Sequence, residues 1–282
     1  MKIKKLTKTL LFIPGFKTLF LKKLQNINTD KYVIDLEDSV PENFKNKARS
    51  NLKNIEKFGL RNKDIFVRIN LDKKKISDDL KSCAKAKIKS FIIPKIRTSQ
   101  DINFIEKLIF KHLRIKAYKI YVLIETAMSL VNLKEICSSS KNIKGLIFGA
   151  EDYLDDMNNY DFYNSSNINF ARSMIPIYAH AFNLDCIDTP FLDLENKNGY
   201  ENHLKVSKSM GYNGILIVHP KQCLLANKYY RPSLASYKLA KNILRVQKSH
   251  KYEKKNISKF RGKLVGPPLV KRAKKILNFF NE

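Results

Sequence analysis

The chain has 282 residues, of which 44% are hydrophobic and 11% aromatic, and its formal net charge is +28. This length and apolar content suit a globular protein and exclude a chain that is disordered throughout. No apolar run approaches the roughly 18 residues that a membrane-spanning helix needs. The apolar stretch near the N-terminus is broken by Pro14 and Gly15, with no small-residue cleavage site after it, so we expect a cytoplasmic location.

The excess of Lys and Arg favours partners that are polyanionic or carry phosphate. These residues are spread over the whole length, and no helix-turn-helix, zinc-finger or RNP pattern accompanies them. We therefore interpret most of the charge as solvated surface and expect no specific nucleic-acid binding. A polyanion-binding protein stays open as an alternative. The four cysteines form no CxxC pair, which favours reduced thiols over a zinc or redox site.

Short β-rich runs recur along the chain, most of them continuously apolar, as is typical of parallel strands buried on both faces. They cover residues 9–14, 32–37, 65–70, 91–95, 120–125, 145–152, 184–189 and 214–220. Helix-like segments lie between them, for example 41–58, 77–87, 99–110 and 129–139. This alternation predicts an α/β fold, specifically a (β/α)8 TIM barrel. An open doubly wound sheet is the alternative, although "PGFKT" lacks the glycine spacing of its phosphate loop.

The pattern changes after Arg231. Residues 233–251 predict an amphipathic helix, 252–268 a basic loop with a short strand, and 268–280 a closing helix. We therefore expect a barrel domain over residues 1–232 and a C-terminal helical extension over 233–282.

Polar or charged residues follow nearly every predicted strand, and in a barrel the carboxyl ends of the strands carry the chemistry. These residues are Asp35, Glu37, Asp38, Arg68, Lys95, Glu125, Glu151, Asp152, Asp188 and His219. Any one of them could be an ordinary solvated loop residue. Their gathering on one rim predicts a functional site there.

Glu125 and Asp152 end consecutive predicted strands, so their carboxylates would converge on the rim. Two hard oxygen ligands with open positions suit Mg²⁺, which can polarise a carbonyl or stabilise a developing enolate. Arg68 would bind a carboxylate or the same oxyanion. The competing interpretation is that the two acids pair with Lys or Arg, or cap the following helices.

Other residues on the rim favour plainer roles. Lys95 is expected to pair with an acid rather than to form a Schiff base. His219 is interpreted as an orienting or packing residue, and Asp188 and Asp193 as residues that hold loops together.

Several motifs follow one another along the chain in a characteristic order: "DLEDSV", "VRIN", "IIPK", "IETA", "GLIFGAEDYLDDM", "FARS" and "GILIVHPKQ". Together they resemble the citrate lyase β-subunit and malyl-CoA lyase family of the HpcH/HpaI aldolase superfamily, over nearly the whole chain. The resemblance implies Mg²⁺-dependent cleavage or formation of a C–C bond in a malyl-, citramalyl- or citryl-type 3-hydroxy-acyl thioester. The products would be an acyl thioester, on CoA or an acyl carrier protein, and a 2-oxo acid.

The resemblance also implies roles for individual residues. Glu125 and Asp152 match the metal ligands, Arg68 the arginine at the reacting oxygens, and Glu37 and Asp38 acids behind the metal. The remaining candidates would bind the thioester substrate or CoA, together with Arg68: Lys17, Lys45, Arg49 and Lys95. Family members assemble as trimers or hexamers in which the C-terminal segment reaches a neighbour's site, so we expect the extension at a subunit interface.

The chain departs from the family pattern at Gly266, where members carry an Asp that moves the proton at the thioester methyl carbon. Glycine has no group to transfer a proton, although His219 or Asp38 could substitute. The alternative function is therefore an acyl-CoA thioesterase, or a CoA-ester-binding relative whose lyase step has decayed.

Overall fold

The computed structural model describes residues 7–60, 63–159, 168–251, 258–260 and 262–280. The chain divides into two compact units, one within residues 6–228 and the other within 229–282. The predicted domain boundary at residue 232 lies four residues beyond this division.

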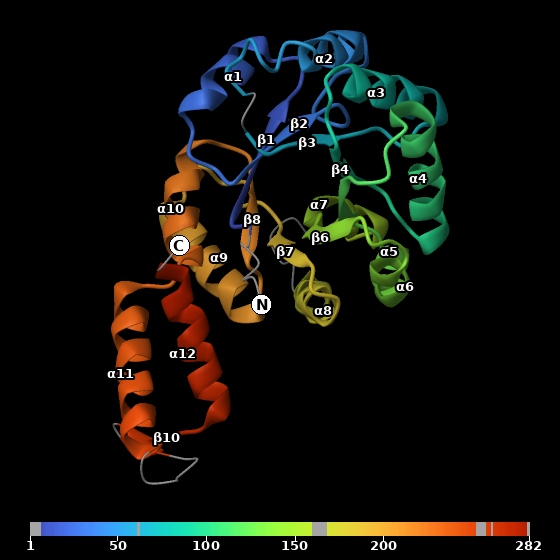
Figure 1. Ribbon diagram of the computed structural model, residues 1–282. Coiled ribbons are helices and arrows are strands. Elements are labelled where there is room, and N and C mark those ends of the chain that lie inside the picture. The colour runs from blue at the N-terminus through green and yellow to red at the C-terminus, as the bar shows by residue number, and fades with distance from the viewer. Residues whose placement is uncertain (1–6, 61–62, 160–167, 252–257, 261, 281–282) are drawn as a thin grey trace. The chain divides into compact units, whose positions relative to one another are not determined.

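The first unit is a closed barrel of eight parallel strands, which confirms the predicted fold class (Figure 1). The strands are β1 Thr9–Pro14, β2 Lys31–Asp35, β3 Ile65–Arg68, β4 Ser90–Ile93, β5 Lys119–Ile124, β6 Ile143–Phe148, β7 Asp185–Asp188 and β8 Gly214–Ile217. The barrel closes through β1 and β8, where Leu10 lies opposite Leu216. This pairing rules out the open doubly wound sheet.

Helices follow the strands in sequence and lie around them in Figure 1. They are α1 Thr18–Lys23, α2 Lys45–Leu52, α3 Lys73–Lys85, α4 Ser99–Leu113, α5 Ala127–Val131, α6 Leu133–Ser138, α7 Ala150–Asp156, α8 Ile168–Ala181, α9 Lys197–Met210 and α10 Lys221–Tyr230. Short 3₁₀ turns cover Leu24–Asn26 and Glu42–Phe44.

The barrel interior is filled by side chains contributed by every strand. This buried cluster contains Leu10, Val33, Phe66, Ile92, Tyr121, Leu123, Ile147, Ile187 and Leu216. Because the other face of each strand packs against helices, the strands read as continuous apolar runs in the sequence. The packed interior leaves the carboxyl ends of the strands as the place for a site.

One expected boundary is wrong in a way that matters for the site. The run 145–152 was predicted to be strand to its end, but β6 stops at Phe148 and α7 begins at Ala150. The acids Glu151 and Asp152 occupy the first turn of α7, where negative charge is favoured by the helix dipole. Asp152 therefore projects from a helix, not from a strand end.

The second unit contains two helices and a hairpin. Helix α11 covers Leu234–Lys251, strands β9 Ser258–Phe260 and β10 Lys263–Val265 pair antiparallel, and α12 covers Pro267–Phe280. These match the helix, short strand and closing helix predicted for this segment. Their shared core contains Ala240, Ile243, Val265, Val270 and Ala273. Within the described parts of the chain, no helix is long and apolar enough to cross a membrane.

Leu123→Ala in β5 should lower the free energy of unfolding by about 2–5 kcal/mol, because it opens a cavity inside the filled barrel. Leu123 is 3% exposed, whereas Leu224 on α10 is 82% exposed and provides the matched control. Urea unfolding followed by circular dichroism measures both variants. Equal losses for Leu123→Ala and Leu224→Ala would contradict the packed interior.

Candidate active site

The site begins with a buried ion pair between neighbouring strands. Asp35 and Arg68 lie opposite each other at the ends of β2 and β3. The Nε and Nη2 atoms of Arg68 donate to the two oxygens of Asp35, at 2.7 and 2.6 Å. Asp35 also accepts from the backbone nitrogens of Glu37 and Ser39, which shapes the loop after β2. Burial acts to raise the pKa of Asp35, but Arg68 outweighs it and the pKa lies below its ordinary value.

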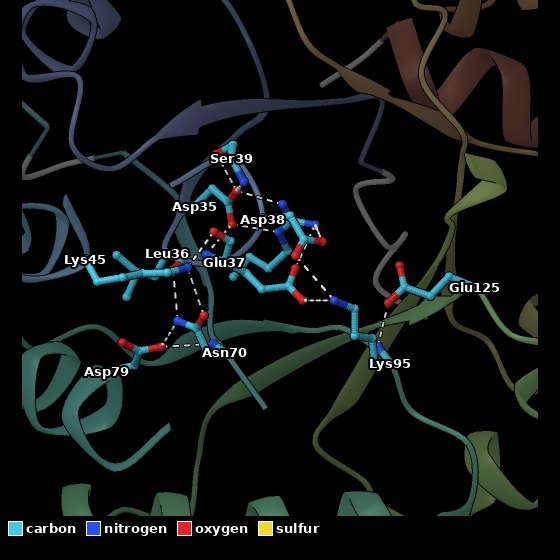
Figure 2. Close-up of polar contacts among 11 residues, drawn as sticks. Asp35, Leu36, Glu37, Asp38, Ser39, Lys45, Asn70, Asp79, Lys95 and Glu125 are labelled. Atoms are coloured by element: carbon cyan, nitrogen blue, oxygen red, sulfur yellow. Dashed lines mark hydrogen bonds and ion pairs between the residues drawn. The ribbon is translucent and has the colours of Figure 1, made fainter. Parts of the chain in front are cut away.

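This pairing turns the remaining side of Arg68 towards two further acids. Its Nη1 atom lies 3.0 Å from Glu37 Oε2 and 3.9 Å from Asp38 Oδ2. Lys95 Nζ approaches the same acids, at 2.9 Å from Glu37 and 3.3 Å from Asp38 (Figure 2). Burial raises the pKa of Glu37 to about 7 even against these cations. Lys95 thus pairs with acids, as expected of a lysine at a strand end.

Lys95 also contacts Glu125 through its backbone. Its nitrogen donates to Glu125 Oε1 at 2.5 Å, as the dashed line in Figure 2 shows. Lys95 holds φ at +53°, in the left-handed region that residues other than glycine rarely adopt. This conformation lets one residue tie Glu125 by its backbone and Glu37 by its side chain.

Glu125 and Asp152 form the second part of the site. Glu125 follows β5 and is 2% exposed, whereas Asp152 lies at the surface in the first turn of α7. A Cβ at Gly149 would lie 2.8 Å from both Cβ and Oε2 of Glu125, so only glycine leaves room for this carboxylate. Burial, and then the charge of Asp152, raise the pKa of Glu125 to about 8.

The residues present fit a magnesium ion. In the described part of the chain, Lys and Arg form no ion pair with Glu125 or Asp152. The described residues contain no group of three or more His, Cys, Asp or Glu side chains arranged to hold a metal, so protein side chains alone would not fill the coordination sphere of a metal ion here. Mg²⁺ is commonly bound through one or two carboxylates and keeps its other positions for water and substrate oxygens. A divalent cation would also relieve the repulsion that raises the pKa of Glu125.

Lys45, predicted to bind substrate, is instead committed to the interior. Its buried Nζ donates to the carbonyl oxygens of Leu36 and Glu37 and to Asn70 Oδ1, at 2.7, 2.7 and 3.0 Å. An ammonium has three donors, so none remains for a ligand. Lys45 therefore supports the loop that carries Glu37 (Figure 2).

Arg49 and Lys17 also lie apart from the ion-pair cluster. Arg49 Nε donates to Asp79 Oδ1 at 2.7 Å, which links α2 to α3. Lys17 is exposed at the start of α1, with its Nζ 4.8 Å from the centre of the Phe16 ring. Of these two residues, only Lys17 presents its charge to solvent.

The sequence interpretation missed the partner of Asp188. Arg172 on α8, within the "FARS" motif, pairs with this buried carboxylate. A single Arg inside a helix does not indicate its ion-pair partner in the sequence. The fold brings Arg172 beside the end of β7. His219 Nδ1 accepts from the backbone nitrogen of Lys221 at 3.2 Å, which suits an orienting role in its turn.

We expect Glu125→Gln to stabilise the metal-free protein at pH 8.5 and to change little at pH 5. The ordinary pKa of 4.5 is raised to about 8 on folding, so the unfolded chain loses its proton first. The free energy of unfolding therefore falls as pH rises from 4.5 towards 8, by at most on the order of 4 kcal/mol. Thermal melts in EDTA measure this difference, and parallel pH curves for the two proteins would contradict the raised pKa.

Comparisons with known proteins identify the family of the chain. The family model described as HpcH/HpaI aldolase/citrate lyase matches residues 8–220. Mitochondrial citramalyl-CoA lyase of Rattus norvegicus is 27% identical over 96% of this chain and 85% of its own length. (3S)-malyl-CoA thioesterase of Cereibacter sphaeroides is 26% identical over 83% of this chain and 80% of its own.

Among solved structures, CitE of Mycobacterium tuberculosis, in complex with magnesium, acetoacetate and coenzyme A, superposes with a TM-score of 0.84. It covers 99% of this chain and 100% of its own, and at 23% identity it supports the fold. The family model confirms the family resemblance that the motifs indicated. The chain belongs to the HpcH/HpaI aldolase/citrate lyase family.

Proposed function

We propose that this protein is a Mg²⁺-dependent carbon–carbon lyase. It would cleave, or form, a malyl-, citramalyl- or citryl-type 3-hydroxy-acyl thioester, giving an acyl thioester and a 2-oxo acid. The observation that carries the proposal is the buried Glu125 beside Asp152, next to the Arg68 and Lys95 cluster. Within the described ranges, neither acid has an ion pair with Lys or Arg. Membership of the family and the lyase names of relatives support it.

In this proposal, Glu125 and Asp152 hold the metal ion. Bound Mg²⁺ supplies a Lewis acid that polarises a carbonyl oxygen and stabilises developing negative charge. Arg68 keeps its Nη1 edge turned towards the acids, and from there it would orient the carboxylate of the 2-oxo-acid half. Lys95 fixes Glu125 and Glu37 relative to each other, which holds the site in place before substrate arrives.

The surroundings suit an anionic substrate. The net charge of +28 would attract a phosphate-bearing thioester such as CoA, or an acidic carrier protein. Exposed Lys17 is the candidate that offers a free charge at the rim. The cytoplasmic location, the homotrimer or hexamer, and the place of the extension at a subunit interface remain part of this proposal.

Lyase activity is tested by 2-oxo-acid release from malyl-CoA, citramalyl-CoA and citryl-CoA, with Mg²⁺ and with EDTA. We expect metal-dependent release, and a loss of about 10²-fold or more in Glu125→Gln and Asp152→Asn, because the developing charge loses its stabilisation. Asp155→Asn, an exposed acid on the same helix α7, is the matched control and should keep wild-type activity. Full turnover in EDTA, or in both site variants, would refute the proposed mechanism.

The second candidate function is an acyl-CoA thioesterase or a decayed lyase, and Gly266 favours it. Gly266 precedes α12, and its carbonyl accepts from the backbone nitrogens of Leu269 and Val270. Among the described residues, a Cβ there would meet Pro268 Cδ alone, at 3.8 Å, so they leave room for a side chain at this position. The absence of an acid at Gly266 is therefore not forced by packing.

Gly266→Asp separates the two functions. Asp is a good residue at a helix N-cap, so we expect the variant to fold with stability close to that of the wild type. If barrel residues move the proton, 2-oxo-acid release should change little. If the wild type releases only free CoA and the variant gains about 10²–10⁴-fold in 2-oxo-acid release, the decayed lyase is supported instead. Simultaneous thiol and 2-oxo-acid assays distinguish these outcomes.

A further inference from the structure

A buried ion pair lies at the end of β7, outside the residues that the proposed chemistry uses. Arg172 on α8 donates through Nε and Nη2 to Asp188, at 3.0 and 2.5 Å. The side chains of Arg172 and Asp188 are 7% and 0% exposed. A charge pair so completely removed from water is costly to bury unless the pair makes further hydrogen bonds.

The pair fixes the residue that follows β7. Asp188 Oδ1 accepts from the backbone nitrogen of Thr189 at 2.9 Å. The carbonyl oxygen of Thr189 lies 3.2 Å from Nε2 of His203 on α9. Burial lowers the pKa of His203, and in the tautomer that carries its proton on Nε2 the neutral ring donates to this carbonyl oxygen. Both backbone groups of Thr189 thus lie within hydrogen-bond distance of a partner, which holds the backbone of this residue in place.

The side chain of Thr189 reaches the helix that carries Asp152. Thr189 Oγ1 accepts from the backbone nitrogen of Ala150, the first residue of α7, at 3.3 Å. At the other end of α7, Asp156 Oδ2 accepts from the backbone nitrogen of Ala127 at 2.7 Å. A seven-residue helix is marginal by itself, so its position depends on such contacts at its ends.

We propose that Thr189, held by the buried Arg172–Asp188 pair, is a positioning residue that sets Asp152 at the metal site. Asp152 is the third residue of α7 and lies two residues beyond the backbone nitrogen that Thr189 holds. A shift of this end of the helix would carry Asp152 away from Glu125, which the backbone of Lys95 fixes independently. The inference rests on the proposed function, since it takes Asp152 to be a ligand.

The test is Mg²⁺ titration by isothermal calorimetry on folded, EDTA-treated full-length protein. Thr189→Val keeps the shape of the side chain and removes the acceptor, so the Mg²⁺ dissociation constant should rise roughly 10-fold or more. Thr189→Ser keeps the oxygen and should bind as the wild type does. Thr189→Ala is a second variant without the acceptor, for use if the added methyl of Val crowds Ala150.

Thr98→Val is the matched control, because Thr98 forms a capping box on α4, which carries none of the proposed site residues. A purely structural role would lower the melting temperature of both Thr→Val variants without changing their Mg²⁺ affinity. Unchanged affinity in Thr189→Val and Thr189→Ala, with binding lost in Asp152→Asn, would overturn this inference alone. Unchanged affinity in Asp152→Asn would overturn the proposed metal site and the inference together.

Discussion

The site depends on one electrostatic constraint: the barrel buries the carboxylate of Glu125, and no Lys or Arg among the described residues forms an ion pair with it. Neighbouring acids are treated differently, because Asp35 is matched by Arg68, and Glu37 by Arg68 and Lys95. The contrast singles out Glu125 as a buried carboxyl group whose ionised form would need a positive charge beside it. In the proposed function, a divalent cation would supply that charge without a further side chain.

Rigid backbone features hold the two parts of the site together. The left-handed Lys95 and the close approach of Gly149 to Glu125 fix where the buried carboxylate can lie. On the other side, Arg68 is clamped by Asp35 on the neighbouring strand, so its Nη1 edge has one direction. Such prior ordering reduces the reorganisation that binding would otherwise require.

The sequence predicted the barrel because its strands are buried on both faces, and it placed Glu125, Arg68 and Lys95 on one rim because strand ends meet there. It could not predict that Lys45 donates all of its hydrogen bonds internally, since this depends on the path of the loop after β2. The Arg172–Asp188 pair was missed for a similar reason. An amphipathic pattern predicts which face of α8 is buried, but it does not predict that Arg172 on this face pairs with Asp188.

The raised pKa of Glu125 bears on how the metal ion of the proposed function would bind. Burial and the charge of Asp152 favour the protonated form of this carboxyl group at neutral pH. Metal binding would then be an exchange in which the cation displaces that proton into the solvent. The apparent heat of loading would therefore vary with the ionisation enthalpy of the buffer, and acidification would oppose loading without any change in the fold.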